Sequence, residues 1–353
     1  MTAARPVPWH PSTTPSPLES RIMIPTTFRP HRSTRLTALA AAAALALTAT
    51  AGCSGDGGTK DDGPVRIALI PAAPPSLPLI AEKNGGFTAQ GLKVKISALP
   101  STSITTFAPG LGRQYDIAWG TPADVIAASA QGHDITVIAG AYLDSTEHSQ
   151  AQIFAAKAGR IASLAGLKGK RIATPSLSGT LYLSVLTSLK KAGVDAKDVT
   201  LVEVPFPTML DQLNAGRVDA VATIQPFIGA LKGAGHTALG DPFLSVASPA
   251  VAGMWIAGRS WAEKNPKKVA SFVAALDAAD TWVAAHDQEA RTFLTTALKL
   301  PPQVMAVAPL PDWDSSISPE ALTPWIDAVS ASGQVNGTLP KPSDLVGTAG
   351  KNG

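Results

Sequence analysis

Small polar residues follow three apolar segments of the sequence, each just before a stretch with helical periodicity. They are Ser76 after the first segment, Gly120 and Thr121 after the second, and Ser178, Gly179 and Thr180 after the third. In open α/β sheets, ligands bind beyond the carboxyl ends of strands, and helix starts offer free N–H groups with a partial positive charge. Three such turns favour a cleft for an anionic or strongly hydrogen-bonding ligand. The alternative is that these hydroxyls only cap helices.

Residues for catalysis or metal binding are not arranged in any familiar pattern. The sequence contains no G-x-S-x-G, H-E-x-x-H or G-x-x-x-x-G-K-[ST] motif. His133, His148, His236 and His286 lie far apart without metal-ligand spacing, so we interpret each as a surface or packing histidine. We therefore expect no catalytic residue, metal site or cofactor.

The elements that would position the three turns form two similar series. Apolar segments 65–70, 92–99, 115–120 and 135–141 alternate with helical patterns at 77–85 and 121–132. Thr121 with Asp124 imitates a capping box. A second series has strand patterns at 170–175, 199–205 and 218–223, with helical patterns at 181–193 and 209–216. Such alternation indicates βαβ units and mostly parallel sheets.

Two later segments complete this organisation. Residues 252–258 are predicted to form a strand that returns to the first lobe, and Asn265 is predicted to cap a helix over 266–285. We predict an α/β fold of two lobes joined by two crossover strands. The first lobe comprises 64–152 and 253–345, the second 153–252, and the tail 346–353.

The N-terminal part has the layout of an export signal. Arg29, Arg32 and Arg35 precede sixteen uncharged residues, 36–51, and the only cysteine of the chain, Cys53, follows. This layout resembles a bacterial lipoprotein signal, which implies that residues 1–52 are removed and that Cys53 carries a lipid. The alternatives are an ordinary secretory signal with a chance cysteine, or a membrane anchor. The apolar segment is short of the roughly 20 residues that a spanning helix needs.

Removing the leader changes the charge of the chain. The leader holds five of the 29 basic residues and one of the 26 acidic residues, which leaves 24 and 25. No basic footprint for nucleic acid remains. Residues 53–63 are rich in Gly and Asp and indicate a solvated tether. The roughly 300 residues after the leader suffice for two compact lobes, and a single cysteine excludes an intramolecular disulfide.

Four stretches of the chain resemble the substrate-binding proteins of ABC importers for nitrate, sulfonates, taurine and thiamine-pyrimidine precursors. The stretches are 77–96, 115–140, 161–204 and 209–227, and the order L-K-G-K-R-I-A-T-P then G-R-V-D-A-V is the most specific part. The resemblance implies the two-lobed periplasmic-binding fold. It also implies that the three turns line the cleft, with Trp119 or Tyr142 as an apolar wall.

Gln225 departs from that family. Many members have an acidic residue before the proline that matches Pro226, whereas here the residue is a neutral amide. An amide removes the charge pairing with a ligand amine, so taurine's ammonium group would be less well served. No Arg lies in the three turns, so an anionic group would rely on N–H groups and hydroxyls. The alternative role for Gln225 is a loop-capping amide.

The function that the resemblance implies is binding without chemistry. The chain would be an exported monomer, anchored by lipid to the outer face of the cytoplasmic membrane, that captures a small polar or oxyanion-type ligand by lobe closure. The permease and ATPase would be separate chains. Two alternatives remain. One is a biosynthetic enzyme for the thiamine pyrimidine, whose branch has a cysteine-rich motif with active-site His and Lys, and the other is a ligand-sensing exported domain.

Overall fold

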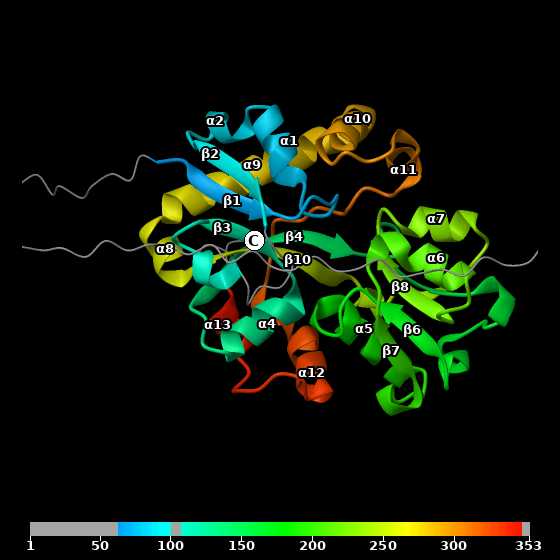
Figure 1. The fold of residues 1–353 in the computed structure, drawn as a ribbon. Helices are drawn as coiled ribbons and strands as arrows, with labels where there is room; N and C mark the ends of the chain where they lie inside the picture. The colour runs from blue at the N-terminus through cyan, green and yellow to red at the C-terminus, as the bar shows by residue number, and fades with distance from the viewer. Residues whose placement is uncertain (1–62, 100–106, 348–353) are drawn as a thin grey trace, which may run out of the picture. The chain divides into compact units, whose positions relative to one another are not determined.

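Two five-stranded sheets organise the protein (Figure 1). The structure is a computed structural model that describes residues 63–99 and 107–347. The predicted leader, Cys53 and nearly all of the predicted tether lie outside the described residues. Each sheet with its helices forms one lobe, as the alternation of strand and helix patterns predicted.

The first sheet has the strand order β2-β1-β3-β10-β4. Its strands are β1 (Val65–Leu69), β2 (Val94–Ala98), β3 (Ile117–Gly120), β4 (Ile135–Asp144) and β10 (Ala250–Gly258). β1 pairs in parallel with β2 and β3, whereas β10 runs antiparallel between β3 and β4. Strand β10 is the predicted returning strand. Its central place explains why it is almost wholly apolar, because helices cover both faces of the sheet.

Helices lie on both faces of the first sheet. Figure 1 shows α1, α2 and α9 on one side and α4 and α13 on the other. The helices of this lobe are α1 (Leu77–Lys83), α2 (Gly86–Ala89), α4 (Pro122–Ala130), α8 (Arg259–Lys264), α9 (Pro266–Ala285), α10 (Asp287–Ala297), α11 (Pro302–Val307), α12 (Thr323–Ser332) and α13 (Pro342–Leu345). Phe272 of α9 stacks on Phe87 and meets Trp255 edge to face, with ring centroids 6.1 and 5.4 Å away. These aromatic contacts fix α9 on the sheet.

The predicted side-chain cap of α9 is wrong. Asn265 occupies the N-cap position but accepts no N–H from the helix with its side chain. Its amide nitrogen instead donates to the Trp261 carbonyl at 2.9 Å. The preceding helix α8 ends at Lys264, so its last carbonyls compete for the same side chain.

The second sheet has the order β7-β6-β8-β5-β9. Its strands are β5 (Ala151–Ala155), β6 (Arg171–Thr174), β7 (Thr200–Glu203), β8 (Ala220–Ile224) and β9 (Thr237–Gly240). Its helices are α5 (Gly179–Lys191), α6 (Met209–Asn214) and α7 (Ile228–Gly233). Ile153 belongs to the same core as the residues of α5, whereas its neighbour Phe154 packs with α6 and α7. Alternation along β5 therefore divides its side chains between the two faces.

The two lobes are connected by residues 145–150 and 241–249, which join strands of different sheets. The predicted lobe limits at 152/153 and 252/253 fall just inside β5 and β10. A C-terminal segment braces the first connection, since the Leu143 N–H donates to the Asp312 carbonyl at 2.8 Å and a His148 ring nitrogen lies 3.0 Å from the Leu310 carbonyl. Helix α12 contacts both α4 and α5.

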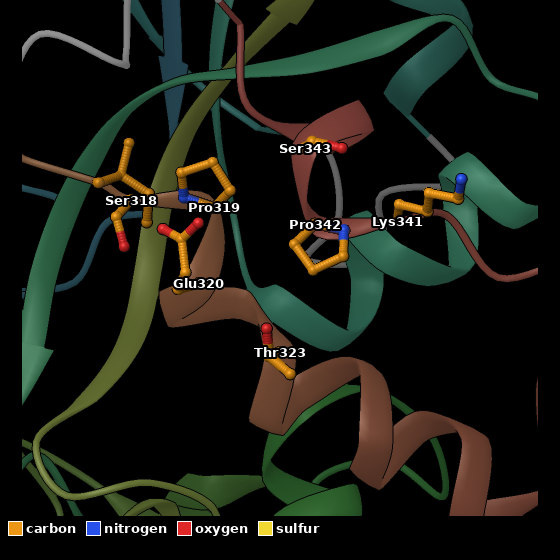
Figure 2. Close-up of a pocket in the computed structure, with 8 residues that line it drawn as sticks. Ser318, Pro319, Glu320, Thr323, Lys341, Pro342 and Ser343 are labelled. Atoms are coloured by element: carbon orange, nitrogen blue, oxygen red, sulfur yellow. The ribbon is translucent and has the colours of Figure 1, made fainter.

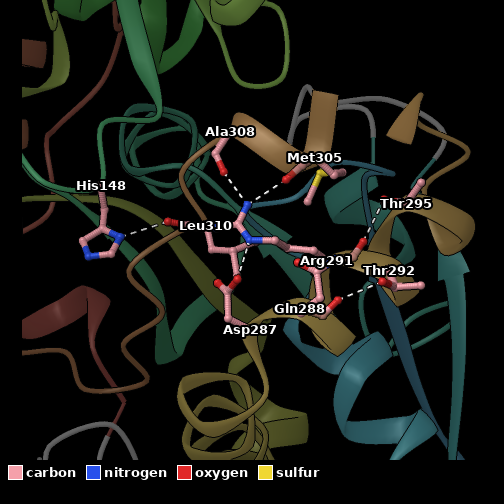
Figure 3. A network of polar contacts seen from close by, with 9 residues as sticks. All are labelled: His148, Asp287, Gln288, Arg291, Thr292, Thr295, Met305, Ala308 and Leu310. Carbon is pink, nitrogen blue, oxygen red and sulfur yellow. Dashed lines mark hydrogen bonds and ion pairs between the residues drawn. The ribbon is translucent and has the colours of Figure 1, made fainter. Parts of the chain in front are cut away.

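Arg291 of α10 holds the start of that bracing segment in place (Figure 3). Its guanidinium donates to the carbonyls of Met305 and Ala308, both at 2.7 Å, and pairs with Asp287 at 2.6 Å. These bonds satisfy carbonyls at and just after the end of α11, which have no partner within the helix.

Among helices of the described ranges, none has both the length and the apolar character to cross a bilayer.

Candidate functional site

A cavity of about 200 Å³ lies between the two lobes, beyond the ends of β3 and β6. Its lining residues are Ile70, Trp119, Thr121, Asp124, Tyr142 and Ala252 from the first lobe, with Pro175, Ser176, Ser178, Gly179, Thr180, Leu181, Phe206, Ile224 and Phe243 from the second. Six of the nine predicted ligand-binding residues are in this set. The cavity is smaller than the roughly 300–1,000 Å³ of drug-sized ligand sites, so a ligand here would be small.

The turn at Gly120 and Thr121, after β3, leads directly into α4. Thr121 has an extended backbone, and Pro122 takes the first helical position. The Thr121 side chain accepts no N–H from the helix; its hydroxyl donates instead to a carboxylate oxygen of Asp124. The capping-box interpretation is therefore wrong. A poorly solvated carboxylate is a strong acceptor and competes for the hydroxyl proton.

The turn at residues 178–180, after β6, leads into α5 through Gly179. This residue has φ +80°, a left-handed backbone that favours glycine. A Cβ at this position would lie 3.3 Å from an oxygen of Asp124, across the cavity. Ser178 makes no side-chain cap, and its hydroxyl lies 3.1 Å from that of Ser176. The start of α5 thus faces Asp124 without a side chain between them.

Thr180 connects the two turns across the lobes. Its hydroxyl oxygen accepts the backbone N–H of Ala123 at 3.0 Å, and the same hydroxyl donates to Thr121 Oγ1 at 2.7 Å. Thr180 is buried, with 4% of its surface exposed. The helix that this residue caps is α4 of the other lobe, so its hydroxyl serves contact between lobes and not the start of its own helix.

Two aromatic residues form a wall of the cavity on the first sheet. A Cβ on Gly253 would lie 2.5 Å from the Tyr142 ring and 2.7 Å from Trp119 Nε1, so only glycine leaves room for both rings. Trp119 Nε1 is buried and has no hydrogen-bond partner among the described residues. Burial, and then the charges of Asp144 and Asp241, raise the pKa of Tyr142 well above its ordinary value. Tyr142 is therefore a neutral phenol at physiological pH.

Asp124 is a charged residue of the cavity lining that the sequence analysis did not place in the cleft. The side chain is half-buried and lines the cavity, and burial raises the pKa of its carboxyl to about 6, opposed by the hydrogen bond from Thr121. Its position on the first turn of a helix after a strand end was visible in the sequence. The capping-box interpretation gave it a local role and hid the fact that it faces the other lobe.

Three predicted residues lie outside the lining of this cavity. Ser76 is fully buried, and its hydroxyl donates to the Ala73 carbonyl at 2.6 Å. Gly120 is the buried last residue of β3. Gln225 lines a different cavity, of about 510 Å³, that also includes Val307 and residues of α7. A ligand contact for these three stays a prediction.

A further cavity has a different character (Figure 2). It measures about 730 Å³ and lies among exposed C-terminal residues, with Ser318, Glu320 and Thr323 on one wall and Lys341 and Ser343 on the other. It shares no lining residue with the cavity between the lobes. Within residues 63–99 and 107–347, no three His, Cys, Asp or Glu side chains come together as a metal site would require.

Comparisons with known proteins agree with this architecture. Residues 76–290, more than half of the chain, match the family model described as NMT1/THI5 like. The chain is 30% identical over 122 residues to the taurine-binding periplasmic protein of Escherichia coli strain K12, a match that covers 34% of this chain and 38% of that protein. The matched part thus spans well under half of that relative.

Two solved structures have the same fold at low sequence identity. The periplasmic aliphatic sulphonate binding protein SsuA from Escherichia coli aligns with a TM-score of 0.69 and 18% identity, covering 80% of this chain and 92% of that one. The alkanesulfonate-binding protein SsuA from Xanthomonas axonopodis pv. citri, bound to MOPS, aligns with a TM-score of 0.65 and 20% identity, covering 79% and 96%. The fold prediction is confirmed, and the chain belongs to the NMT1/THI5-like family.

Proposed function

We propose that this protein is the extracytoplasmic substrate-binding component of an ABC importer. It captures a small polar organic or oxyanion-type ligand, such as a sulfonate or a pyrimidine, in the cavity between the lobes and performs no chemistry. The permease and ATPase are separate chains. The mature protein begins at Cys53, is exported, and is held as a monomer on the outer face of the cytoplasmic membrane by a lipid on that cysteine.

The observation that carries this proposal is the pair of hydrogen bonds that Thr180 makes across the cavity. The Thr180 hydroxyl belongs to the second lobe. It accepts the N–H of Ala123 and donates to Thr121, and both of these residues belong to the first lobe. Such bonds exist only while the lobes meet, so a ligand that adds contacts to both turns shifts the equilibrium towards the closed arrangement. Binding and closure are coupled in this way without any covalent step.

The composition of the cavity supports binding over the biosynthetic alternative. Its lining combines hydroxyls and a helix start with aromatic and aliphatic walls, and the residues of that lining include no His, Lys or Cys. The enzyme branch described above uses His and Lys in its active site. The relatives named above are binding proteins, which also favours this function.

Thermal and chemical unfolding with candidate ligands tests the proposal. A ligand at a hundredfold excess over its Kd should raise the free energy of unfolding by about 2.7 kcal/mol. The screen covers sulfonates, nitrate and pyrimidines. Absence of stabilisation by every compound would contradict the proposed ligand class.

Two glycine variants place the binding site. Gly179→Ala adds a methyl group 3.3 Å from Asp124 in the cavity, whereas Gly193 has a similar positive φ of +76° and nothing within 4 Å of an added Cβ. Both variants carry the same kind of backbone strain. We expect ligand stabilisation to persist in Gly193→Ala and to be lost in Gly179→Ala. Equal loss in both would place the ligand elsewhere.

A further inference from the structure

The cavity between the lobes contains a carboxylate without a balancing cation. Asp124 and Tyr142 are the ionisable residues of its lining, which has no Lys, Arg or His. Burying a carboxylate away from water is unfavourable unless other groups pair with it. Asp124 accepts the Thr121 hydroxyl, and a carboxylate has room for further donors.

The position of Asp124 directs this unused capacity towards the cavity. Its oxygens lie 3.3 and 3.4 Å from where a Cβ of Gly179 would stand, and Gly179 has none. Asp124 also lines the cavity, so a molecule bound in the cavity meets the carboxylate directly. In the same lining, Trp119 Nε1 is buried without an acceptor among the described residues. The cavity thus offers the Asp124 carboxylate as an acceptor for further donors and the Trp119 N–H as a donor without an acceptor.

We propose that the ligand presents a protonated amine, or a comparably strong N–H donor, to Asp124. This inference rests on the proposed function and narrows it to amine-bearing ligands. A simple oxyanion, such as nitrate or an unsubstituted alkanesulfonate, would bring a second negative charge beside that of Asp124. Charge pairing with a ligand amine, which the neutral Gln225 cannot provide, is thus provided by Asp124 on the opposite lobe.

The protonation of Asp124 makes this preference depend on pH. Burial raises the pKa of its carboxyl to about 6, so the carboxylate is charged at pH 8 and mostly neutral at pH 5. The elements packed against α4 carry these titratable residues: Tyr142 and Asp144 on β4, Tyr182, Lys190 and Lys191 on α5, and Asp327 on α12. Tyr142 alone of these lines the cavity, and it stays neutral over this range.

Calorimetry with matched probes tests the inference. The pairs are taurine with ethanesulfonate and 4-aminopyrimidine with pyrimidine, measured at pH 8 on the wild type, Asp124→Asn and Asp211→Asn. Asp211 is exposed on α6 and gives a control for the same chemical change. For at least one pair, we expect the amine-bearing member to bind about 10- to 100-fold more tightly in the wild type and in Asp211→Asn. In Asp124→Asn the preference should fall to within about threefold.

The outcomes separate this inference from the proposed function. Equal binding of both members by the wild type, or a preference that survives in Asp124→Asn, would overturn the role of Asp124 and leave the binding function intact. Failure of all four probes to bind the wild type would overturn both. Should Asp124→Asn fold poorly, the wild type at pH 5 provides the second measurement. A preference for the amine there as large as at pH 8 also contradicts the inference.

Discussion

Two acidic sites lie close to the junction of the lobes, and they differ in what their carboxyls face. Asp124 faces the cavity. Asp144, at the end of β4, faces Asp241, which lies in the connection 241–249. The charges of both carboxyls raise the pKa of Tyr142. One oxygen of Asp144 accepts the Gln150 N–H at 3.0 Å, and the other has no hydrogen-bond donor among the described residues.

The difference decides what each carboxyl can gain. Asp241 accepts the Ser149 hydroxyl at 2.6 Å and the Phe243 N–H at 2.9 Å. These two hydrogen bonds stabilise the charged form of Asp241 more than the hydrogen bond from Gln150 stabilises that of Asp144. Burial and the nearby Asp241 charge raise the pKa of Asp144 to about 8. Two facing carboxyls disfavour each other's ionisation, whereas a carboxyl that lines a cavity is open to a ligand. The ionisation of the Asp144–Asp241 pair therefore depends on pH, whereas that of Asp124 depends on both pH and a bound ligand.

The largest expected effect is a change in the pH dependence of stability on replacing Asp144. Folded Asp144 keeps its proton up to about pH 8, whereas the unfolded carboxyl loses it near 3.8, so the wild-type free energy of unfolding falls as pH rises across this window. Asp144→Asn should remove about 3–5 kcal/mol of that decline. Urea unfolding from pH 4 to 9 measures it.

Asp124→Asn in the same pH series sharpens the comparison. Its carboxyl has a pKa of about 6, so this variant should remove only the part of the decline between about pH 4 and pH 6. Stability curves of Asp144→Asn and the wild type that run parallel at all pH values would show that Asp144 does not hold a proton as argued.

An intermediate effect is expected at the aromatic wall. In Gly253→Ala the added methyl group must displace the Tyr142 ring and the Trp119 indole, which should cost about 1–3 kcal/mol of unfolding free energy. Gly258→Ala on the same strand is the control, because nothing lies within 4 Å of its added Cβ. Chemical unfolding followed by tryptophan fluorescence compares them. Equal stability of the two variants would mean that the wall is not tightly packed.

The smallest effect concerns the hydroxyls of the turn at residues 178–180. Thr180→Val removes the acceptor of the Ala123 N–H and should lower stability by about 1 kcal/mol. Ser178→Ala removes a more exposed hydroxyl that contacts only Ser176 among the described side chains, so its cost should stay below about 0.5 kcal/mol. Thermal unfolding resolves the two. A larger cost at Ser178 would reverse the roles assigned to these residues.

The local order of strands and helices was predictable because hydrophobic periodicity acts over a few residues. The segments at 65–70, 135–141 and 209–216 became β1, β4 and α6 with ends within three residues. Gly120, Thr121 and the residues 178–180 were placed correctly at strand-to-helix turns. Helix caps were predicted less well, because Thr121 and Asn265 had competing partners of similar strength nearby.

The sequence alone determined the two-lobed α/β fold, three candidate turns and the family resemblance, since all three depend on patterns along the chain. Only the tertiary structure decided which turn residues face one another. Thr180 meets Ala123 and Thr121 across more than fifty residues of sequence, and Asp124 meets Gly179 in the same way. Those pairings depend on how two separately built sheets approach each other, which is a property of long-range packing that periodicity and turn chemistry do not encode.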